Sequence, residues 1–208
     1  PEQVTLTLVK AEEREGLRHD LNAFWADFRG TSYEGQTAGG TANTNNGVIS
    51  ARTPVDAAGG MLYWAKKIGE GFDSGAVGCP IVVDDALIVY AGKHIYRVNR
   101  DTGAVEATGE MTDTSSFSIT PPTYYDGMVF VGLSGGRVQA FDAVTLKSLW
   151  LYTDPMGGQP NCPITVYNGR LYTGFWNSET KDGNFVCLTV TDEDPQRGDE
   201  SKCAAWRH

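Results

Sequence analysis

The sequence contains few side chains of the types that perform acid–base, nucleophilic or metal chemistry. Its histidines, His19, His94 and His208, lie far apart in the chain, and no serine, histidine and carboxylate form a recognisable nucleophilic motif. The four cysteines include no Cys-x-x-Cys pair, which argues against a zinc site. These patterns indicate no catalytic residue and no cofactor.

The cysteines fall into two pairs with different expectations. Cys187 and Cys203 bracket an acidic insertion and could lie on adjacent strands, within the range of a disulfide; two unpaired buried thiols are the alternative. Cys79 and Cys162 each precede a proline, at equivalent points of two sequence repeats described below. We expect these two to be small buried side chains.

Two polar loops are candidates for ligand binding. Asp192 and Asp194 are weak calcium candidates, because the acidic stretch lacks the ligand spacing of an EF-hand and a solvated loop is favoured. The segment 177–182 is longer than the equivalent turns, and long loops on a rigid scaffold often carry function. Trp176 and Asn177 begin it: an exposed indole would suit stacking on a sugar or peptide, and packing in the core is the favoured alternative.

A repeat of 42 residues organises most of the chain. Three turn dipeptides follow one another at this interval, each preceded by a proline and a short strand and followed by an apolar run: Asp84-Asp85, Asp126-Gly127 and Asn168-Gly169. Asp-Gly and Asn-Gly favour the tight turn of a two-residue hairpin. A third strand, a polar turn and a fourth strand complete each repeat. Four short antiparallel strands in about 42 residues are typical of a β-propeller blade.

The repeat resembles the pyrroloquinoline-quinone-like (PQQ-like) propeller repeat, which runs from a proline through an Asp-Gly turn and an Asp-x-x-Thr-Gly turn to a strand with a tryptophan. Trp64, Trp150 and Trp206 fall at or near the tryptophan position, and Ala107 replaces it in one repeat. The amino-acid sequence of segments 134–142 and 173–179 resembles that of uncharacterised secreted or surface PQQ-like propeller proteins of Gram-positive gut bacteria.

We therefore expect an all-β chain of about three four-stranded PQQ-like blades, at approximately 61–106, 107–149 and 150–208, within a propeller segment 49–208. Residues 1–48 are expected to hold a strand, a short helix over roughly 11–28 and a connector. The helix is predicted because four apolar residues repeat at helical spacing: Leu17, Leu21, Phe24 and Phe28.

The resemblance implies that the innermost strand of each blade lines a central channel. The residues before the prolines would supply that strand, and four of them are channel-lining or ligand candidates: Ser116, Ser118, Gln159 and Asn161. Small polar side chains suit both a solvated channel and a ligand site, so the two interpretations stay open.

Three blades are too few to close a ring, because closed propellers usually have about 4–8 blades. The sequence stops at His208, apparently inside a fourth strand, so we read this chain as part of a larger ring. The remaining blades would come from a missing C-terminal portion, a second chain or self-association.

Charge and hydropathy exclude two classes of partner for this segment. With 17 basic and 26 acidic residues and a net charge of −9, the chain lacks a nucleic-acid footprint. No apolar stretch approaches the roughly 18 residues of a membrane span, and any targeting signal lies outside the sequence.

The resemblance leads us to expect a non-catalytic propeller scaffold of a secreted or cell-surface bacterial protein that binds a protein or glycan. Quinoprotein alcohol dehydrogenases resemble the chain only in the repeat; they place their quinone beside an adjacent Cys-Cys pair, and no two cysteines are adjacent here. A quinone-dependent oxidoreductase fragment is therefore an alternative, as is an envelope assembly factor.

Overall fold

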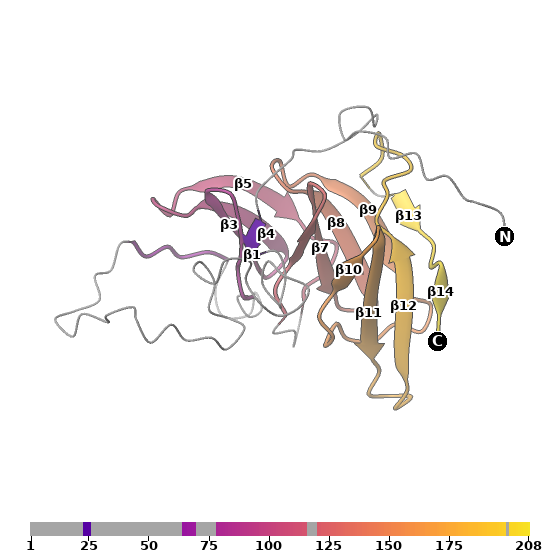
Figure 1. The fold of residues 1–208 in the computed structure, drawn as a ribbon. Coiled ribbons are helices and arrows are strands. Elements are labelled where there is room, and N and C mark those ends of the chain that lie inside the picture. The colour runs from indigo at the N-terminus through magenta and orange to yellow at the C-terminus, as the bar shows by residue number, and fades with distance from the viewer. Residues whose placement is uncertain (1–22, 26–63, 70–77, 116–119, 199) are drawn as a thin grey trace, which may run out of the picture.

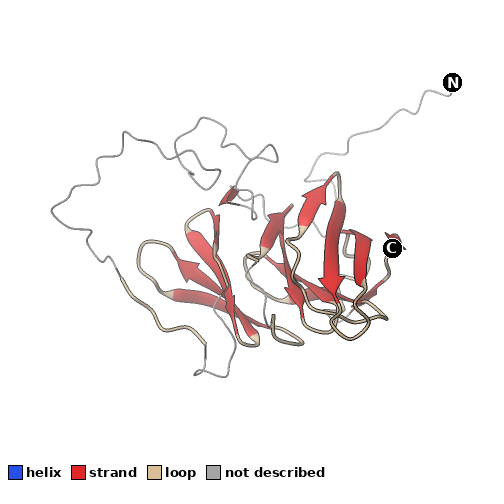
Figure 2. Cartoon of the chain, turned by 90° about the horizontal axis from the view of Figure 1, so that it is seen from below, coloured by secondary structure: helices blue, strands red, loops and turns tan. Residues whose placement is uncertain are grey.

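The described part of the chain is built from β-strands. The computed structural model describes residues 23–25, 64–69, 78–115, 120–198 and 200–208, and no helix occurs within these ranges (Figure 2). The described residues consequently include no helix long and apolar enough to cross a membrane. The predicted all-β fold class is confirmed.

The strands form three sheets, each with a core of four antiparallel strands (Figure 1). The first contains β2 (Ile81–Val83), β3 (Ala86–Ala91), β4 (His94–Asn99) and β5 (Val105–Glu110). The second contains β6 (Thr123–Tyr125), β7 (Met128–Leu133), β8 (Arg137–Asp142) and β9 (Ser148–Thr153). The third contains β10 (Thr165–Tyr167), β11 (Arg170–Trp176), β12 (Gly183–Thr189) and β14 (Trp206–Arg207).

The repeated dipeptides form the hairpin turns that the sequence predicts. Asp84, Asp126 and Asn168 have φ angles of 50°, 49° and 48°, in the left-handed region that a two-residue hairpin turn requires at its first central residue. Each turn joins the first and second strands of its sheet, so the three sheets are successive copies of one unit.

Two strands extend these units. β13 (Glu200–Lys202) leaves the third unit and pairs in parallel with β9, at the outer edge of the second sheet. β1 (Ala23–Trp25) pairs antiparallel with β2 at the edge of the first sheet. β5 runs across the blade boundary expected at 106/107 and is the fourth strand of the first sheet's core. β9 runs across the boundary expected at 149/150 and is the fourth strand of the second sheet's core.

The helix predicted over roughly 11–28 is wrong where the structure describes it. Residues 23–25 are extended and pair with β2 because the sheet edge offers unpaired backbone groups to a segment rich in aromatic residues. The rest of that segment, with the N-terminal strand and connector, lies outside the described residues.

The core consists of two apolar layers, one on each side of the second sheet. Val129, Val131 and Leu133 of β7 pack toward the first sheet, whereas Met128 and Phe130 pack toward the third. Because successive side chains of a strand point to opposite faces, a strand buried on both faces reads as a continuous apolar run. This explains why the runs after the turns are apolar rather than alternating.

One residue of each unit accepts a recurring hydrogen bond from a side chain outside its own sheet. This residue follows the third strand, and its own backbone N–H donates to a carbonyl of the hairpin turn in the same unit. The three equivalent residues are Arg100, Ala143 and Val190. The indole Nε1 of Trp64 donates to the carbonyl of Arg100 over 2.8 Å. The indole of Trp150, which is fully buried, donates to the carbonyl of Val190 over 3.4 Å. The backbone acceptor of the third unit thus receives a side chain from the second, and Trp64, which precedes the first sheet, bonds to the equivalent acceptor of the first unit.

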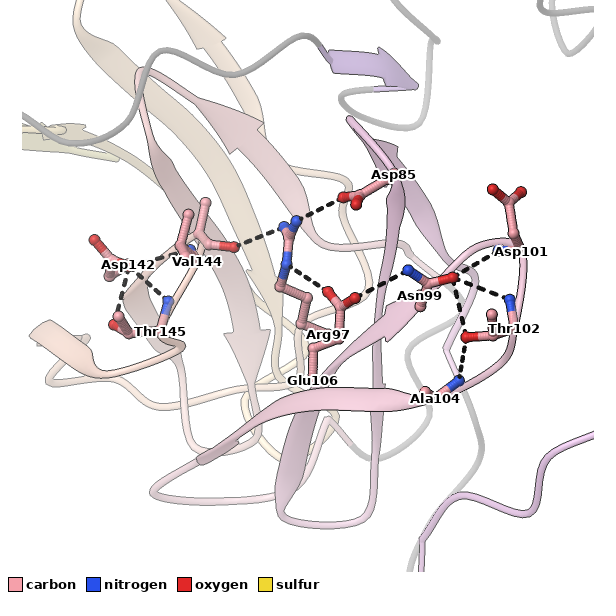
Figure 3. A network of polar contacts seen from close by, with 11 residues as sticks. Asp85, Arg97, Asn99, Asp101, Thr102, Ala104, Glu106, Asp142, Val144 and Thr145 are labelled. Carbon is pink, nitrogen blue, oxygen red and sulfur yellow. Dashed lines mark hydrogen bonds and ion pairs between the residues drawn. The ribbon is translucent and has the colours of Figure 1, made fainter.

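The unit with Ala107 in place of tryptophan uses Arg97 instead. Its guanidinium donates to the carbonyl of Ala143 over 3.3 Å, the acceptor equivalent to Arg100 and Val190. Asp85 and Glu106 hold the guanidinium at 3.0 and 3.2 Å (Figure 3). The side chain of Arg97 is only 10% exposed, so it packs in the space between the first two sheets as an indole would.

The turn after the third strand is shaped by a side-chain oxygen. Asn99 Oδ1 accepts from the backbone N–H groups of Asp101 and Thr102, and Asp142 Oδ1 accepts equivalently from Val144 and Thr145 (Figure 3). These are Asx turns, which Asn and Asp favour because the side chain reaches the backbone two residues ahead. The Asp-x-x-Thr spacing of the repeat follows from this geometry.

We expect Arg97→Met to lower the free energy of unfolding by about 2 kcal/mol, because it removes hydrogen bonds from a charged donor while keeping the length of the side chain. Urea denaturation of the variant measures this. Arg100→Met is the matched control, since the Arg100 side chain is 47% exposed, and we expect it to change stability by less than about 0.5 kcal/mol. Equal effects of the two substitutions would contradict the role assigned to Arg97.

Candidate functional site

An open pocket of about 260 Å³ lies at one end of the third sheet, opposite the turn between β10 and β11. It is lined by the connection from β9 to β10 and by the tip of the β11–β12 hairpin: Met156, Gly157, Gly158, Gln159, Trp176, Asn177, Ser178 and Glu179. Three ligand candidates predicted from sequence, Gln159, Trp176 and Asn177, meet here although 16 residues separate Gln159 from the other two along the chain.

The two halves of the pocket are joined by backbone pairing. Gln159 N–H donates to the carbonyl of Trp176 over 2.7 Å, and Trp176 N–H donates to the carbonyl of Gln159 over 3.0 Å. This isolated antiparallel bridge brings the polar loop onto the end of β11. A residue on the incoming connection and a residue on the hairpin therefore become neighbours.

Gly158 permits the close approach of these segments. Its φ is +113°, a value that side chains with a Cβ rarely adopt. A Cβ at this position would lie 2.9 Å from the Cβ of Phe175 and 3.1 Å from the carbonyl oxygen of Trp176. Only glycine can therefore bring the loop this close to β11.

A buried carboxylate holds the loop in place. Asp154 is 2% exposed and accepts hydrogen bonds from the Tyr152 hydroxyl at 2.8 Å, Asn184 Nδ2 at 3.0 Å and the Met156 backbone N–H at 2.9 Å. Burial and the hydrogen bond to Asp154 raise the pKa of Tyr152 above its ordinary value. The three donors satisfy the carboxylate, so the loop that begins at Asp154 has a defined conformation before any ligand arrives.

The pocket residues divide into structural and available groups. Asn177 is structural: its Nδ2 donates to the Met156 carbonyl over 3.0 Å, and its Oδ1 accepts from the Glu179 backbone over 3.0 Å. The Trp176 side chain is 51% exposed. Gln159 Oε1 is buried and has no hydrogen-bond partner. The indole and the exposed Ser178 and Glu179 are the groups that can meet a ligand.

The other predicted channel residues do not join this pocket. Asn161 is exposed and its backbone donates to the carbonyl of Gln159, but it does not line the pocket. Ser116 and Ser118 lie outside the described residues, so their role as channel-lining residues stays a prediction.

The acidic insertion is organised around a lysine that sequence reasoning missed. Lys202 has a side chain only 3% exposed, and its ammonium binds both carboxylate oxygens of Glu193 and the carbonyl of Thr191. A lysine in a short strand after an acidic run was the available signal. The insertion thus carries its own cation, and the weak calcium candidates Asp192 and Asp194 belong to no group of three or more metal-ligating residues in the described part of the chain.

The structure decides between the alternatives for the cysteines. Cys187 and Cys203 are free thiols rather than a disulfide, because Trp206 rather than Cys203 lies opposite Cys187 and Ala205 N–H donates to the Cys187 carbonyl; Cys187 is buried and Cys203 is exposed. Cys79 and Cys162 are exposed rather than buried. Both lie just before the first strand of their four-stranded units.

Comparison with known proteins defines the class. Residues 45–188, more than half of the chain, match the PQQ_2 family, described as outer membrane protein assembly factor BamB. The chain belongs to this family of PQQ-like propeller proteins. No protein among the curated sequences matches it.

Solved structures share the fold with this chain at low sequence identity. The quinohemoprotein alcohol dehydrogenase ADHIIG of Pseudomonas putida HK5 superimposes with a TM-score of 0.50 and 20% identity, over 62% of this chain and 20% of that enzyme. A europium-containing methanol dehydrogenase superimposes with a TM-score of 0.50 and 17% identity, over 68% of this chain and 26% of that one. The BamB of Moraxella catarrhalis has a TM-score of 0.44 and 15% identity, over 64% of this chain and 37% of that one. This chain therefore spans a fifth to a quarter of the two dehydrogenases, and the likeness to them shows the fold alone.

We expect Glu193 to titrate at low pH. Partial burial raises its pKa, but hydrogen bonds from Lys202 and Thr191 outweigh burial and lower the pKa from 4.5 to about 2. A lowered carboxylate pKa contributes stability above pH 4.5, and this contribution is lost as the pH falls toward 2. Carboxyl-detected NMR titration measures the shift. Lys202→Met should raise the pKa of Glu193, whereas Lys147→Met, at an exposed site, should leave it unchanged.

Proposed function

We propose that this chain forms part of a non-catalytic propeller scaffold of a secreted or cell-surface bacterial protein, and that it binds a protein or glycan partner at the Trp176 pocket. The observation that carries the proposal is a half-exposed indole beside polar groups, on a loop fixed by the buried Asp154. Ligand sites combine an aromatic surface with a few placed polar groups, and preorganisation lowers the cost of binding.

The composition of the pocket supports binding rather than catalysis. Glu179 is the one titratable side chain among the residues that line it, and it is exposed. General acid–base catalysis needs a positioned group whose pKa suits the reaction, usually with a second group to exchange the proton. The adjacent cysteine pair implied by the resemblance to quinoprotein alcohol dehydrogenases is also missing from the sequence.

A second candidate is an envelope assembly factor. The match of residues 45–188 to a family described as outer membrane protein assembly factor BamB favours it. In that case the partner would be a protein of the envelope. The exposed indole of Trp176 at the pocket favours the first candidate.

We further propose that an additional four-stranded blade covers the outer face of the third sheet. Tyr172, Phe185, Trp206 and His208 form an aromatic patch there, with ring centroids of neighbours 5.6 to 6.1 Å apart, and Phe185 and Trp206 are 47% and 40% exposed. Trp206 lies opposite Cys187, as Trp150 lies opposite Ala140 in the second sheet. Trp150 packs against the next unit, so a further unit is the partner that fits Trp206.

If the aromatic patch is such an interface, the isolated chain should associate in a concentration-dependent way, because exposed apolar faces attract one another. Sedimentation velocity over a range of concentrations measures this. Trp206→Ser should weaken the association, while Trp176→Ser should not. A wild-type chain that stays monomeric with an intact thermal transition would contradict the proposal.

The binding proposal predicts that the protein captures members of a glycan or peptide array through Trp176. We expect Trp176→Ala to weaken capture about tenfold or more, which corresponds to about 1.4 kcal/mol, and Trp206→Ala to leave it unchanged. Incubation with calcium and pyrroloquinoline quinone tests the oxidoreductase alternative in parallel. Stoichiometric uptake of the quinone absorbance would overturn the non-catalytic assignment, and capture unaffected by Trp176→Ala would overturn the site.

A further inference from the structure

We propose that the Trp176 pocket recognises a carbohydrate, with one sugar ring stacked on the Trp176 indole and its hydroxyl groups bonded to Ser178 and Glu179. This inference rests on the binding function proposed above and names its ligand class. The observations behind it are the exposed indole, the exposed polar side chains beside it, the backbone pairing between the two loops and the charges around the pocket.

The indole supplies an apolar surface of the right kind. Trp150, by comparison, is fully buried and its N–H bonds to a backbone carbonyl, whereas Trp176 keeps 51% of its side chain exposed at the rim of the pocket. An exposed aromatic side chain that does not fill a core offers its flat face to a partner. The C–H face of a sugar ring is flat and apolar, and matches such a surface.

Two polar side chains beside the indole give the ligand a reason to carry hydroxyl groups. Ser178 and Glu179 line the pocket and are exposed, so a bound molecule can reach their oxygen atoms. Each sugar hydroxyl can both donate and accept, so one ring can donate to the carboxylate of Glu179 and exchange hydrogen bonds with the hydroxyl of Ser178.

Three observations disfavour an extended peptide or an anion. The backbone groups that a peptide strand would use at this point, those of Gln159 and Trp176, already bond to each other. The volume of about 260 Å³ lies below the roughly 300–1,000 Å³ of typical ligand sites, which suits a single ring. Among the described residues no lysine or arginine lines the pocket, and the chain carries a net charge of −9, which disfavours phosphate and acidic ligands.

The fixed loop supports recognition by shape. Asn177 joins the hairpin to the carbonyl of Met156, and Gly158 N-terminal to Gln159 is pressed against Phe175. The backbone that carries Trp176, Ser178 and Glu179 is therefore placed by the fold rather than by the ligand. A rigid spacing of this kind selects among sugars by the position of their hydroxyl groups.

The test uses the whole chain against two arrays, one of short neutral oligosaccharides built from glucose, galactose, mannose, xylose and N-acetylglucosamine, and one of unmodified peptides. Affinities for the sugars captured are then measured by titration calorimetry. We expect at least one oligosaccharide to bind, Trp176→Ala and Glu179→Ala each to weaken it about tenfold or more, and Trp206→Ala to leave it unchanged. Because the contacts are uncharged or exposed, raising the salt concentration should alter the affinity less than about twofold.

Three results would overturn the inference, and they differ in what else they remove. Trp176-dependent capture of peptides without any sugar would refute the carbohydrate and leave the binding function intact. Sugar binding lost in Trp206→Ala but kept in Trp176→Ala would move the sugar to the aromatic patch. No capture on either array, by a protein whose urea unfolding is normal, would refute the carbohydrate and the pocket's binding function together.

Discussion

The structure depends on one recurring contact, in which a side chain of one four-stranded unit donates a hydrogen bond to the same backbone carbonyl of the next. Trp64, Trp150 and Arg97 are the donors, and Arg97 and Trp150 lie between the first and second and between the second and third sheets. The acceptor is available because the turn that follows the third strand is folded back by its own side-chain oxygen. This contact adds a defined direction to the apolar layer that the sheets share, which by itself is non-directional.

The exchange of an indole for a guanidinium shows which part of the contact is essential. Arg97 keeps a hydrogen-bond donor at the end of an aliphatic stem. It adds ion pairs to Asp85 and Glu106 that hold the guanidinium in place. The Trp64 ring packs so closely against Gly103 of the first unit that a Cβ there would clash. The equivalent residue of the second unit is Leu146. The position is free to carry a leucine because no indole stacks on that turn.

The pocket is a consequence of the same architecture. Antiparallel pairing places the tip of the β11–β12 hairpin and the connection from β9 at one end of the third sheet. The turn between β10 and β11 lies at the other end. Asp154 then fixes the connection, and the resulting surface presents Trp176 beside Gln159. The sheets thus act as a rigid support, and the chemistry of the site resides in two loops that their packing leaves uncovered.

The sequence by itself determined the strands, the turns and the repeat, because Asp84, Asp126 and Asn168 need a left-handed conformation and the apolar runs need burial on both faces. It also pointed to Trp176, Asn177 and Gln159 separately, through loop length and position before a proline. Only the tertiary structure decided that these three meet, that Arg97 replaces an indole, that Lys202 neutralises Glu193 and that the thiols of Cys187 and Cys203 stay apart. The reason is physical: local propensity acts over a few residues, whereas these contacts join residues that only the pairing of strands and the packing of sheets bring together.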